Sequence, residues 1–200
     1  MPRLRLRLRL LTFALCLTPL TPALAHPHVW VDYQLTVLFE NGKITALQQD
    51  WLFDDEFTTS VMNDVAHHKG GGPFTAGEVA KLKQSAFSNL KGYDYFTHVW
   101  AGGTPIKLGS EAKEFQPSLE GEQLRYRFTL PLPQAVDPHK GPVAVGIWDD
   151  SYYVDVGPLK GKSPILKGDG AAGCKAQIAE DKDHPIYFGS INPQTVKVSC

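Results

Sequence analysis

The chain has 200 residues, of which 42% are apolar and 20% charged, as is typical of a globular protein with one hydrophobic core. Its formal net charge is −1. Proteins that bind nucleic acids usually carry clustered positive charge, so we expect no nucleic-acid partner. The 18 glycines and 15 prolines indicate many turns between short elements.

Residues 1–25 have the three parts of a secretory signal peptide. Four arginines lie between residues 3 and 9, an apolar run covers residues 10–17, and Ala23-Leu24-Ala25 resembles a cleavage site. Cys16 raises the alternative of a lipoprotein signal, but the bulky Leu15 precedes it. The apolar run is shorter than the roughly 20 residues that span a bilayer. We expect cleavage after Ala25 and one periplasmic domain, residues 26–200, not inserted in the membrane.

Cleavage changes the charge of the chain and its first residue. Removing residues 1–25 takes away four arginines and no acidic residue, which leaves 16 basic and 21 acidic residues, a formal charge of −5. The mature chain then begins at His26. Two cysteines remain, Cys174 and Cys200, and an even pair in an oxidising compartment predicts one disulfide rather than two free thiols.

The mature chain opens with a strand and a tight hairpin. Apolar residues alternate with mostly polar ones over residues 28–39, which predicts a β-strand with one buried face. Asn41-Gly42 predicts a two-residue type I′ turn and a returning strand over residues 43–53. Without a bulge, this turn pairs Val31 with Leu52 and brings His28 opposite Asp55. Gln48 would then face Leu35 on the apolar side, which indicates that the register can slip.

A helical hairpin is predicted over residues 54–92. Phe53, Phe57, Val61 and Val65 recur every four residues, as on the buried face of a helix. Thr75-x-x-Glu78 is a capping box that begins a second helix, and Gly92 ends it. Further short strands are predicted over residues 95–100, 106–108, 113–119, 124–130, 143–148, 152–156, 175–179 and 195–198, with a turn-rich stretch at 161–173. We therefore predict an α+β fold, mainly an antiparallel sheet or sandwich with an inserted helical hairpin.

His26-Pro27-His28 is the strongest candidate for a metal site. An N-terminal histidine offers its amine and its imidazole to one ion, and imidazole suits zinc, copper and nickel. Pro27 has no amide hydrogen, which argues against a planar site built from deprotonated backbone amides. His28 supplies a second imidazole. The alternative is a frayed terminus with solvated histidines.

Carboxylates elsewhere in the sequence could complete such a site. Asp54 and Asp55 lie at the predicted strand-to-helix junction, where the alternative role is N-capping and favourable charge at the helix terminus. Asp149 lies in an acidic turn before a strand, and a tight turn with an Asp–Ser hydrogen bond explains much of this pattern without a metal.

The remaining histidines have no clear pattern. His67 and His68 end the first predicted helix and are interpreted as a solvated C-terminal turn, with a mobile metal-capture loop as the alternative. His98, His139 and His184 are isolated in the sequence, and none of them is assigned a role.

Four segments together resemble a known family. They are His26-Pro27-His28-Val29-Trp30-Val31-Asp32, Trp51-Leu52-Phe53-Asp54-Asp55, Tyr95-Phe96-Thr97, and residues 149–155 with Tyr152-Tyr153. In this order they resemble the DUF1007 family of exported bacterial proteins over nearly the whole mature chain. Asp55 stands where that family usually has Glu, and Asp150 where it usually has Pro, which puts the tightness of that turn in doubt.

The resemblance implies a periplasmic component of an ABC-type transport system, often found beside nickel/cobalt-type permeases. We therefore expect a non-enzymatic accessory protein that binds a divalent transition metal (Zn, Ni, Co or Cu) and works with a membrane permease or metal transporter. Its expected ligands are His26, His28 and Asp54 or Asp55, with Asp149 as a further candidate. The alternatives are a copper-dependent enzyme with a terminal histidine brace, and a structural module that binds a permease.

Overall fold

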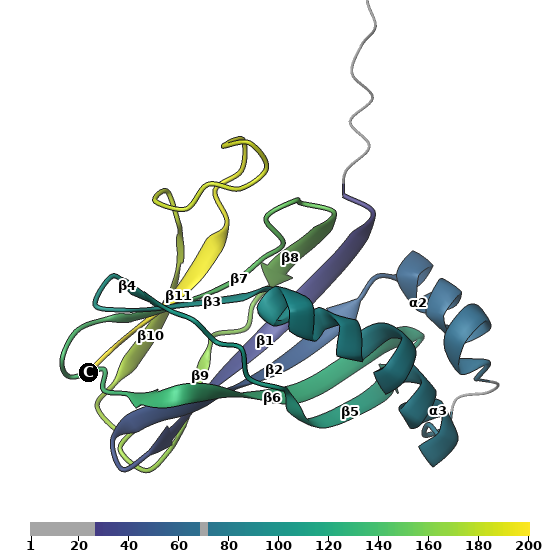
Figure 1. Ribbon diagram of the computed structural model, residues 1–200, viewed down its shortest axis with the longest axis horizontal. Helices are drawn as coiled ribbons and strands as arrows, with labels where there is room; N and C mark the ends of the chain where they lie inside the picture. The colour runs from purple at the N-terminus through teal and green to yellow at the C-terminus, as the bar shows by residue number, and fades with distance from the viewer. Residues whose placement is uncertain (1–26, 69–71) are drawn as a thin grey trace, which may run out of the picture.

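In the computed structural model, which describes residues 27–68 and 72–200, the strands form two sheets with helices beside them (Figure 1). The first sheet has the order β5-β6-β2-β1-β8, and β9 also pairs with β1. It comprises β1 (Val29–Glu40), β2 (Lys43–Phe53), β5 (Lys113–Glu120), β6 (Gln123–Val136), β8 (Val154–Pro158) and β9 (Ile165–Gly168). The second sheet, ordered β10-β11-β7-β3-β4, comprises β3 (Thr97–Ala101), β4 (Thr104–Ile106), β7 (Val143–Ile147), β10 (Lys175–Glu180) and β11 (Gln194–Ser199). The predicted α+β sandwich is confirmed.

The β1–β2 hairpin forms as predicted near its turn, but its register changes further along. Asn41 and Gly42 both have positive φ angles, 51° and 74°, as a type I′ turn requires. Phe39 pairs with Ile44, whereas Leu38 pairs with Ala46, so Thr45 is an extra residue in a β-bulge. Beyond the bulge Val31 pairs with Phe53. The prediction that Val31 faces Leu52 and His28 faces Asp55 is therefore wrong.

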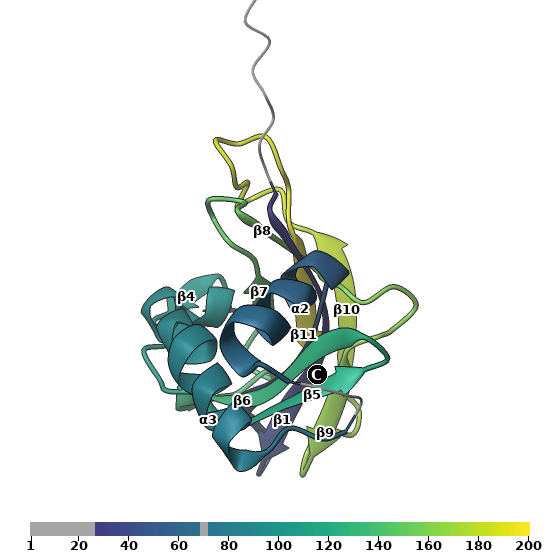
Figure 2. The ribbon, with the colours of Figure 1, turned by 90° about the vertical axis from the view of Figure 1, so that its right-hand side faces the viewer.

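The helical hairpin lies at one side of the sheets, away from β10 and β11 (Figures 1 and 2). The helix α2 (Asp55–Val61) continues into a π-helical turn, Met62–Ala66. The helix α3 (Ala76–Leu82) begins at the predicted capping box, in which Thr75 and Glu78 each accept from the other's backbone N–H. It continues into a π-helical turn, Lys83–Phe87, and a 3₁₀ segment, Ser88–Phe96.

Two predicted strands begin later than expected, and one strand was not predicted. β3 begins at Thr97 rather than at residue 95, because Asp94, Tyr95 and Phe96 all have left-handed φ angles. β8 begins two residues later than predicted, because Tyr152 has a φ angle of 56°. The stretch predicted to be turn-rich, residues 161–173, includes β9, which pairs with β1 in parallel, as β8 does.

The core lies between the two sheets and beneath the helices. The alternation predicted for β1 is confirmed, since Val29, Val31, Tyr33, Leu35, Val37 and Phe39 are all buried. Gln49 is fully buried among them, at 0% exposure. Its side-chain amide donates to Thr97 Oγ1 (2.8 Å), and its carbonyl accepts from Trp51 Nε1 (2.9 Å). The bond to Thr97 connects the two sheets, and both bonds offset the cost of burying an amide.

The C-terminus is tied to the second sheet by the predicted disulfide, Cys174–Cys200, which is confirmed. The bond joins the residue before β10 to the residue after β11, and these two strands are hydrogen-bonded neighbours. Among the described residues, no helix is long and apolar enough to cross a membrane.

Candidate functional site

The beginning of β1 lies in a corner between two other segments. On one side the His28 N–H donates to the carbonyl of Tyr153 (2.9 Å), and the two rings lie 4.8 Å apart. On the other side the Asp54 N–H donates to the carbonyl of Trp30 (3.1 Å). The first residues that the structure describes are thereby held between the start of α2 and the loop before β8.

Asp54 makes the second of these contacts, the one with Trp30. Its Oδ1 accepts from the Phe57 N–H (2.8 Å), which makes it the predicted N-cap of α2. Its Oδ2 accepts from the Trp30 N–H (2.8 Å). One carboxylate therefore fixes the start of the helix and the start of β1 together. Asp55, the next residue, is exposed in the first turn of α2.

Asp149 organises the opposite side of the corner. Its Oδ1 accepts from the N–H and hydroxyl of Ser151 (2.9 and 2.8 Å). Its Oδ2 accepts from the N–H groups of Tyr153 and Val154 (both 3.1 Å). The carboxylate closes the loop over its own backbone and presents the half-exposed Tyr153 beside His28.

Three of the predicted ligands, His28, Asp54 and Asp149, lie at this corner, and the carboxylates of Asp54 and Asp149 already accept hydrogen bonds. Both carboxylate oxygens of Asp54 and of Asp149 accept backbone hydrogen bonds, which makes positioning their visible role. His26 lies outside the described residues. Within residues 27–68 and 72–200, no group of three or more His, Cys, Asp or Glu side chains could hold a metal ion.

The other histidines are less isolated than the sequence indicated. His68 is not part of a solvated turn, because its Nδ1 lies 2.9 Å from Glu78 Oε1 and its ring packs 4.6 Å from Phe74. This contact joins the end of one helix to the start of the other. The backbone N–H and hydroxyl of Thr75, together with His68, lower the pKa of Glu78 to about 2.

An aromatic cluster that sequence reasoning missed covers part of the second sheet. The His98 ring lies 4.6 Å from Trp148, and the Trp100 ring lies 4.3 Å from His184. Trp148 lies against Gly146, where an added Cβ would come within 2.0 Å of the indole ring. His98 and Trp100 are two residues apart in a predicted strand, so their side chains lie on the same face of the sheet. This spacing is the sequence feature that could have indicated the cluster.

His184 is held in this cluster by a buried carboxylate. Its Nδ1 lies 3.0 Å from Asp181 Oδ2, which also accepts from the Thr195 hydroxyl (2.7 Å). Burial alone would raise the pKa of Asp181, but the hydrogen bonds from Thr195 and His184 lower it overall. The arrangement secures the loop that follows β10.

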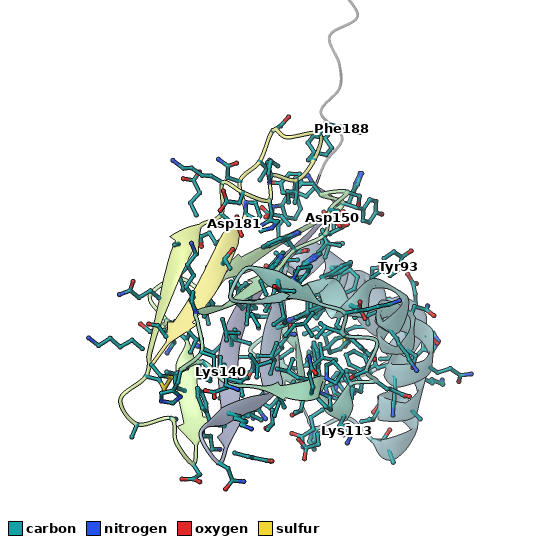
Figure 3. All side chains as sticks on the ribbon, turned by 60° about the vertical axis from the view of Figure 1, so that its left-hand side comes forward. Tyr93, Lys113, Lys140, Asp150, Asp181 and Phe188 are labelled. Carbon is teal, nitrogen blue, oxygen red and sulfur yellow. A yellow bond between two sulfur atoms is a disulfide. The ribbon has the colours of Figure 1, made fainter. Side chains whose placement is uncertain are left out.

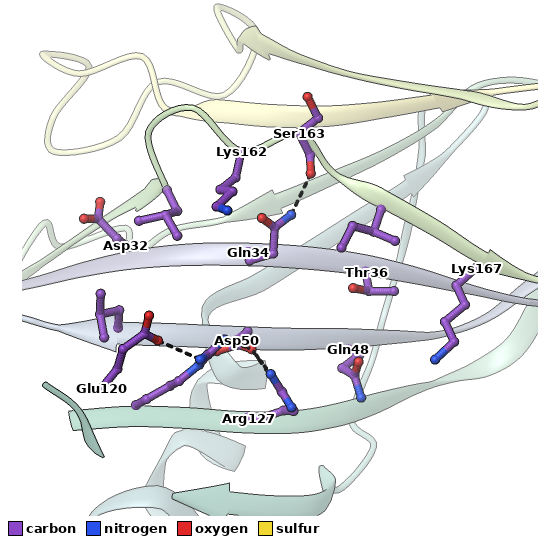
Figure 4. Close-up of a pocket in the computed structure, with 14 residues that line it drawn as sticks. Asp32, Gln34, Thr36, Gln48, Asp50, Glu120, Arg127, Lys162, Ser163 and Lys167 are labelled. Carbon is purple, nitrogen blue, oxygen red and sulfur yellow. Dashed lines mark hydrogen bonds and ion pairs between the residues drawn. The ribbon is translucent and has the colours of Figure 1, made fainter. Parts of the chain in front are cut away.

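A polar groove of about 650 Å³ lies on the outward face of the first sheet (Figure 4). At its centre Asp50 accepts from both Arg125 and Arg127, with distances of 2.7 Å to Nη2 of each. Glu120 adds a second partner for Arg125 (2.6 Å). Gln34 donates to the Ser163 carbonyl (2.7 Å) and so ties β1 to the loop before β9. The central charges of this groove are therefore paired among themselves.

The fold and the corner together define a class: a two-sheet protein with an inserted helical hairpin and a disulfide that secures its C-terminus. Comparison with known proteins then gives its family. The chain belongs to the DUF1007 family, because the family model described as "Protein of unknown function (DUF1007)" matches residues 11–192. The resemblance seen in the sequence is confirmed.

Two relatives illustrate this membership. An uncharacterized protein of Haemophilus influenzae is 29% identical over 173 residues, covering 84% of this chain and 81% of that protein. An uncharacterized 15.5 kDa protein of Spirochaeta aurantia, encoded in the trpE 3′ region, is 36% identical over 125 residues. This second match covers 62% of the present chain and 87% of the relative.

Proposed function

We propose that this protein is an exported, periplasmic accessory protein that binds a divalent transition metal (Zn, Ni, Co or Cu) through its mature N-terminus. The observation that carries the proposal is the anchored start of β1. Asp54 and the loop organised by Asp149 hold residues 28–30 from both sides. In the sequence His26 stands two residues before this anchored backbone.

The chemistry of the proposed site follows from cleavage after Ala25. The freed amine of His26, with a reference pKa near 7.7–8.0, deprotonates readily, and the amine and imidazole of His26 can chelate one ion. His28 supplies a second imidazole, and the exposed Asp55, at the start of α2, supplies a carboxylate. Asp54 and Asp149 position the site in this proposal, because their oxygens serve the backbone.

Export and a membrane partner form part of the same proposal. The Cys174–Cys200 disulfide is typical of an oxidising compartment, which supports export. Trp30 and Tyr153 are about half exposed at the corner, and the fully exposed Phe188 lies at the same end of the molecule as Asp150 (Figure 3). Exposed aromatic side chains at one end are suited to contact with a partner, which we propose to be a membrane permease or metal transporter.

Calorimetric titration with Zn²⁺, Ni²⁺, Co²⁺ and Cu²⁺ tests the site. The protein beginning at His26 is compared with one that carries a single extra glycine before His26, and with His28→Ala. We expect one tight site, weakened at least about tenfold by either change, which corresponds to about 1.4 kcal/mol. His139→Ala is the matched control, since His139 is an exposed histidine beside Asp137 at a distant turn. Equal binding by all four proteins would contradict the proposal.

A further inference from the structure

The polar groove extends beyond the ion pairs at its centre. Its floor is formed by the adjacent strands β1, β2 and β6, and its rim by β9 and the loop before β9 (Figure 4). Gln34 and Thr36 lie on the outward face of β1, and Gln48 lies on β2 directly opposite Thr36. The volume of about 650 Å³ falls within the roughly 300–1,000 Å³ that is usual for sites of small organic ligands.

Thr36 places an unpartnered hydroxyl on the floor of this groove. The residue is only 8% exposed, and its hydroxyl makes no hydrogen bond within residues 27–68 and 72–200. In that part of the chain, the buried side-chain atoms that lack both a partner and solvent access belong to Tyr33, His68 and Tyr126. The Thr36 oxygen is not one of these atoms, so a ligand in the groove can reach it. Thr129 on β6 is equally buried, but its hydroxyl donates to Glu114 (2.9 Å).

Two lysines on the rim give the groove positive charge that its acids do not neutralise. Lys162, in the loop before β9, and Lys167, on β9, are exposed and form no ion pair with any described residue. Ile165 pairs with Thr36, and Lys167 lies two residues further along the same face of β9. Figure 4 shows the Lys167 side chain reaching from β9 towards β2 at the Gln48 end of the groove. Ammonium groups of this kind bind carboxylate and phosphate oxygens.

The opposite end of the groove offers hydrogen-bond acceptors. Asp32 lies four residues before Thr36 on the same face of β1, roughly 13 Å away along the strand, and forms no ion pair with a described residue. Between them, Gln34 donates its amide to the Ser163 carbonyl, which leaves its own side-chain carbonyl as an acceptor. The side-chain amide of Gln48 has no partner among the described residues, so it can both donate and accept.

This combination of groups matches a sugar ring better than a peptide. Hydroxyls and amides that donate and accept suit ring hydroxyls, and the apolar side chains of Leu52, Leu159 and Ile165 suit the C–H faces of a ring. The three strands of the floor each have neighbours on both sides, so a peptide could not join the sheet there as an added strand.

We propose that the polar groove binds an acidic sugar, in which a ring carries one carboxylate or phosphate group. The acidic group lies beside Thr36 and Lys167, and the ring hydroxyls face Gln34, Gln48 and Asp32. This inference goes beyond metal binding and does not depend on it, because no predicted metal ligand lines the groove.

Titrations with sodium glucuronate and glucose 6-phosphate test the proposal, with glucose, inorganic phosphate and trialanine as comparison probes. Binding to the protein beginning at His26 is followed by amide NMR in the absence of metal. We expect saturable one-to-one binding of an acidic sugar, with shifts centred on Thr36 and Gln48 and an affinity at least about fivefold above that for glucose or phosphate. The tighter of the two acidic sugars identifies the acidic group. Absence of saturable binding of both acidic sugars, or equally tight binding of trialanine, would overturn the proposal.

Two pairs of variants locate the site. Thr36→Val removes the hydroxyl but keeps the shape of the side chain, and it should weaken binding of the acidic sugar roughly fivefold, the size of one hydrogen bond, whereas Thr36→Ser should retain it. Lys167→Met should weaken the acidic sugar roughly tenfold and leave glucose unchanged, because a hydrogen bond to a charged group is stronger. Lys197→Met is its matched control, since Lys197 is an exposed lysine on β11 in the other sheet.

Thermal midpoints accompany these titrations. The midpoint of Thr36→Val should not fall, because the hydroxyl that it removes has no partner among the described residues. A lowered midpoint, unchanged binding by Thr36→Val, or equal weakening by Lys167→Met and Lys197→Met would contradict the proposal.

Discussion

The first sheet carries the polar groove on its outward face and an apolar pocket of about 240 Å³ on its inward face, and both involve the strands β1, β2 and β6. Neighbouring residues belong to different hollows, as Trp51 and Leu52 do. In the polar groove the central carboxylate, Asp50, is paired with two arginines, whereas the apolar pocket is lined almost entirely by apolar side chains. The outward face is therefore stabilised in part by charge, and the inward face by packing.

The largest difference between the two faces should appear when neighbouring side chains are removed. Trp51→Ala removes a buried indole that contacts Phe53 and Phe128, and we expect a loss of about 3–5 kcal/mol in the free energy of unfolding. Leu52→Ala on the outward face should cost less than about 1.5 kcal/mol. Urea denaturation of both variants measures the difference. Similar losses would show that the two faces are packed alike.

The next effect concerns the ion pairs of the polar groove. Asp50→Ala leaves Arg125 and Arg127 without their shared carboxylate, and we expect a loss of roughly 1–2 kcal/mol, limited by the partial exposure of both guanidinium groups. Glu122→Ala, at the exposed turn between β5 and β6, is the control. If urea denaturation finds no difference between the variants, the groove is not held together by its charges.

An effect of similar size is expected where β1 meets α2. Asp54→Ala removes the N-cap of α2 and the acceptor for the Trp30 N–H, and it should cost about 1–2 kcal/mol. Asp55→Ala should change stability by less than about 0.5 kcal/mol, because Asp55 is exposed and caps nothing. Thermal unfolding of the pair distinguishes positioning by Asp54 from a general effect of negative charge.

The smallest effect depends on pH. Burial in the polar groove, together with the charge of Asp155, raises the pKa of Asp32 against the opposing influence of Lys160. A raised carboxyl pKa penalises the folded state once the group is ionised, so the penalty is present at neutral pH and disappears below about pH 4. Asp32→Asn should therefore raise the thermal midpoint at pH 7 but not at pH 3. A stabilisation that is equal at both pH values would contradict this origin.

Local features of this fold could be predicted from the sequence. The alternation of β1, the Asn41-Gly42 turn, the cap at Asp54 and the Thr75–Glu78 capping box all depend on neighbouring residues, and all four are present. The disulfide could also be predicted, because only two cysteines remain after the predicted cleavage.

Features that depend on contacts between distant residues could not be predicted from the sequence. The bulge at Thr45 changes the register so that Gln49, opposite Leu35, bonds to Thr97 in the other sheet, and no local pattern marks that contact. The parallel pairing of β8 and β9 with β1 joins segments more than 100 residues apart. The same long-range pairing places Tyr153 beside His28 and so creates the corner.

Anomalous diffraction from crystals of the protein beginning at His26, grown with Zn²⁺, would reveal whether this N-terminus binds a metal ion. We predict one ion bonded to the amine and imidazole of His26 and to the imidazole of His28, with zinc–nitrogen distances of about 2.0–2.1 Å. An ion found only beside His139 or His184, or no ordered ion at residue 26, would contradict it.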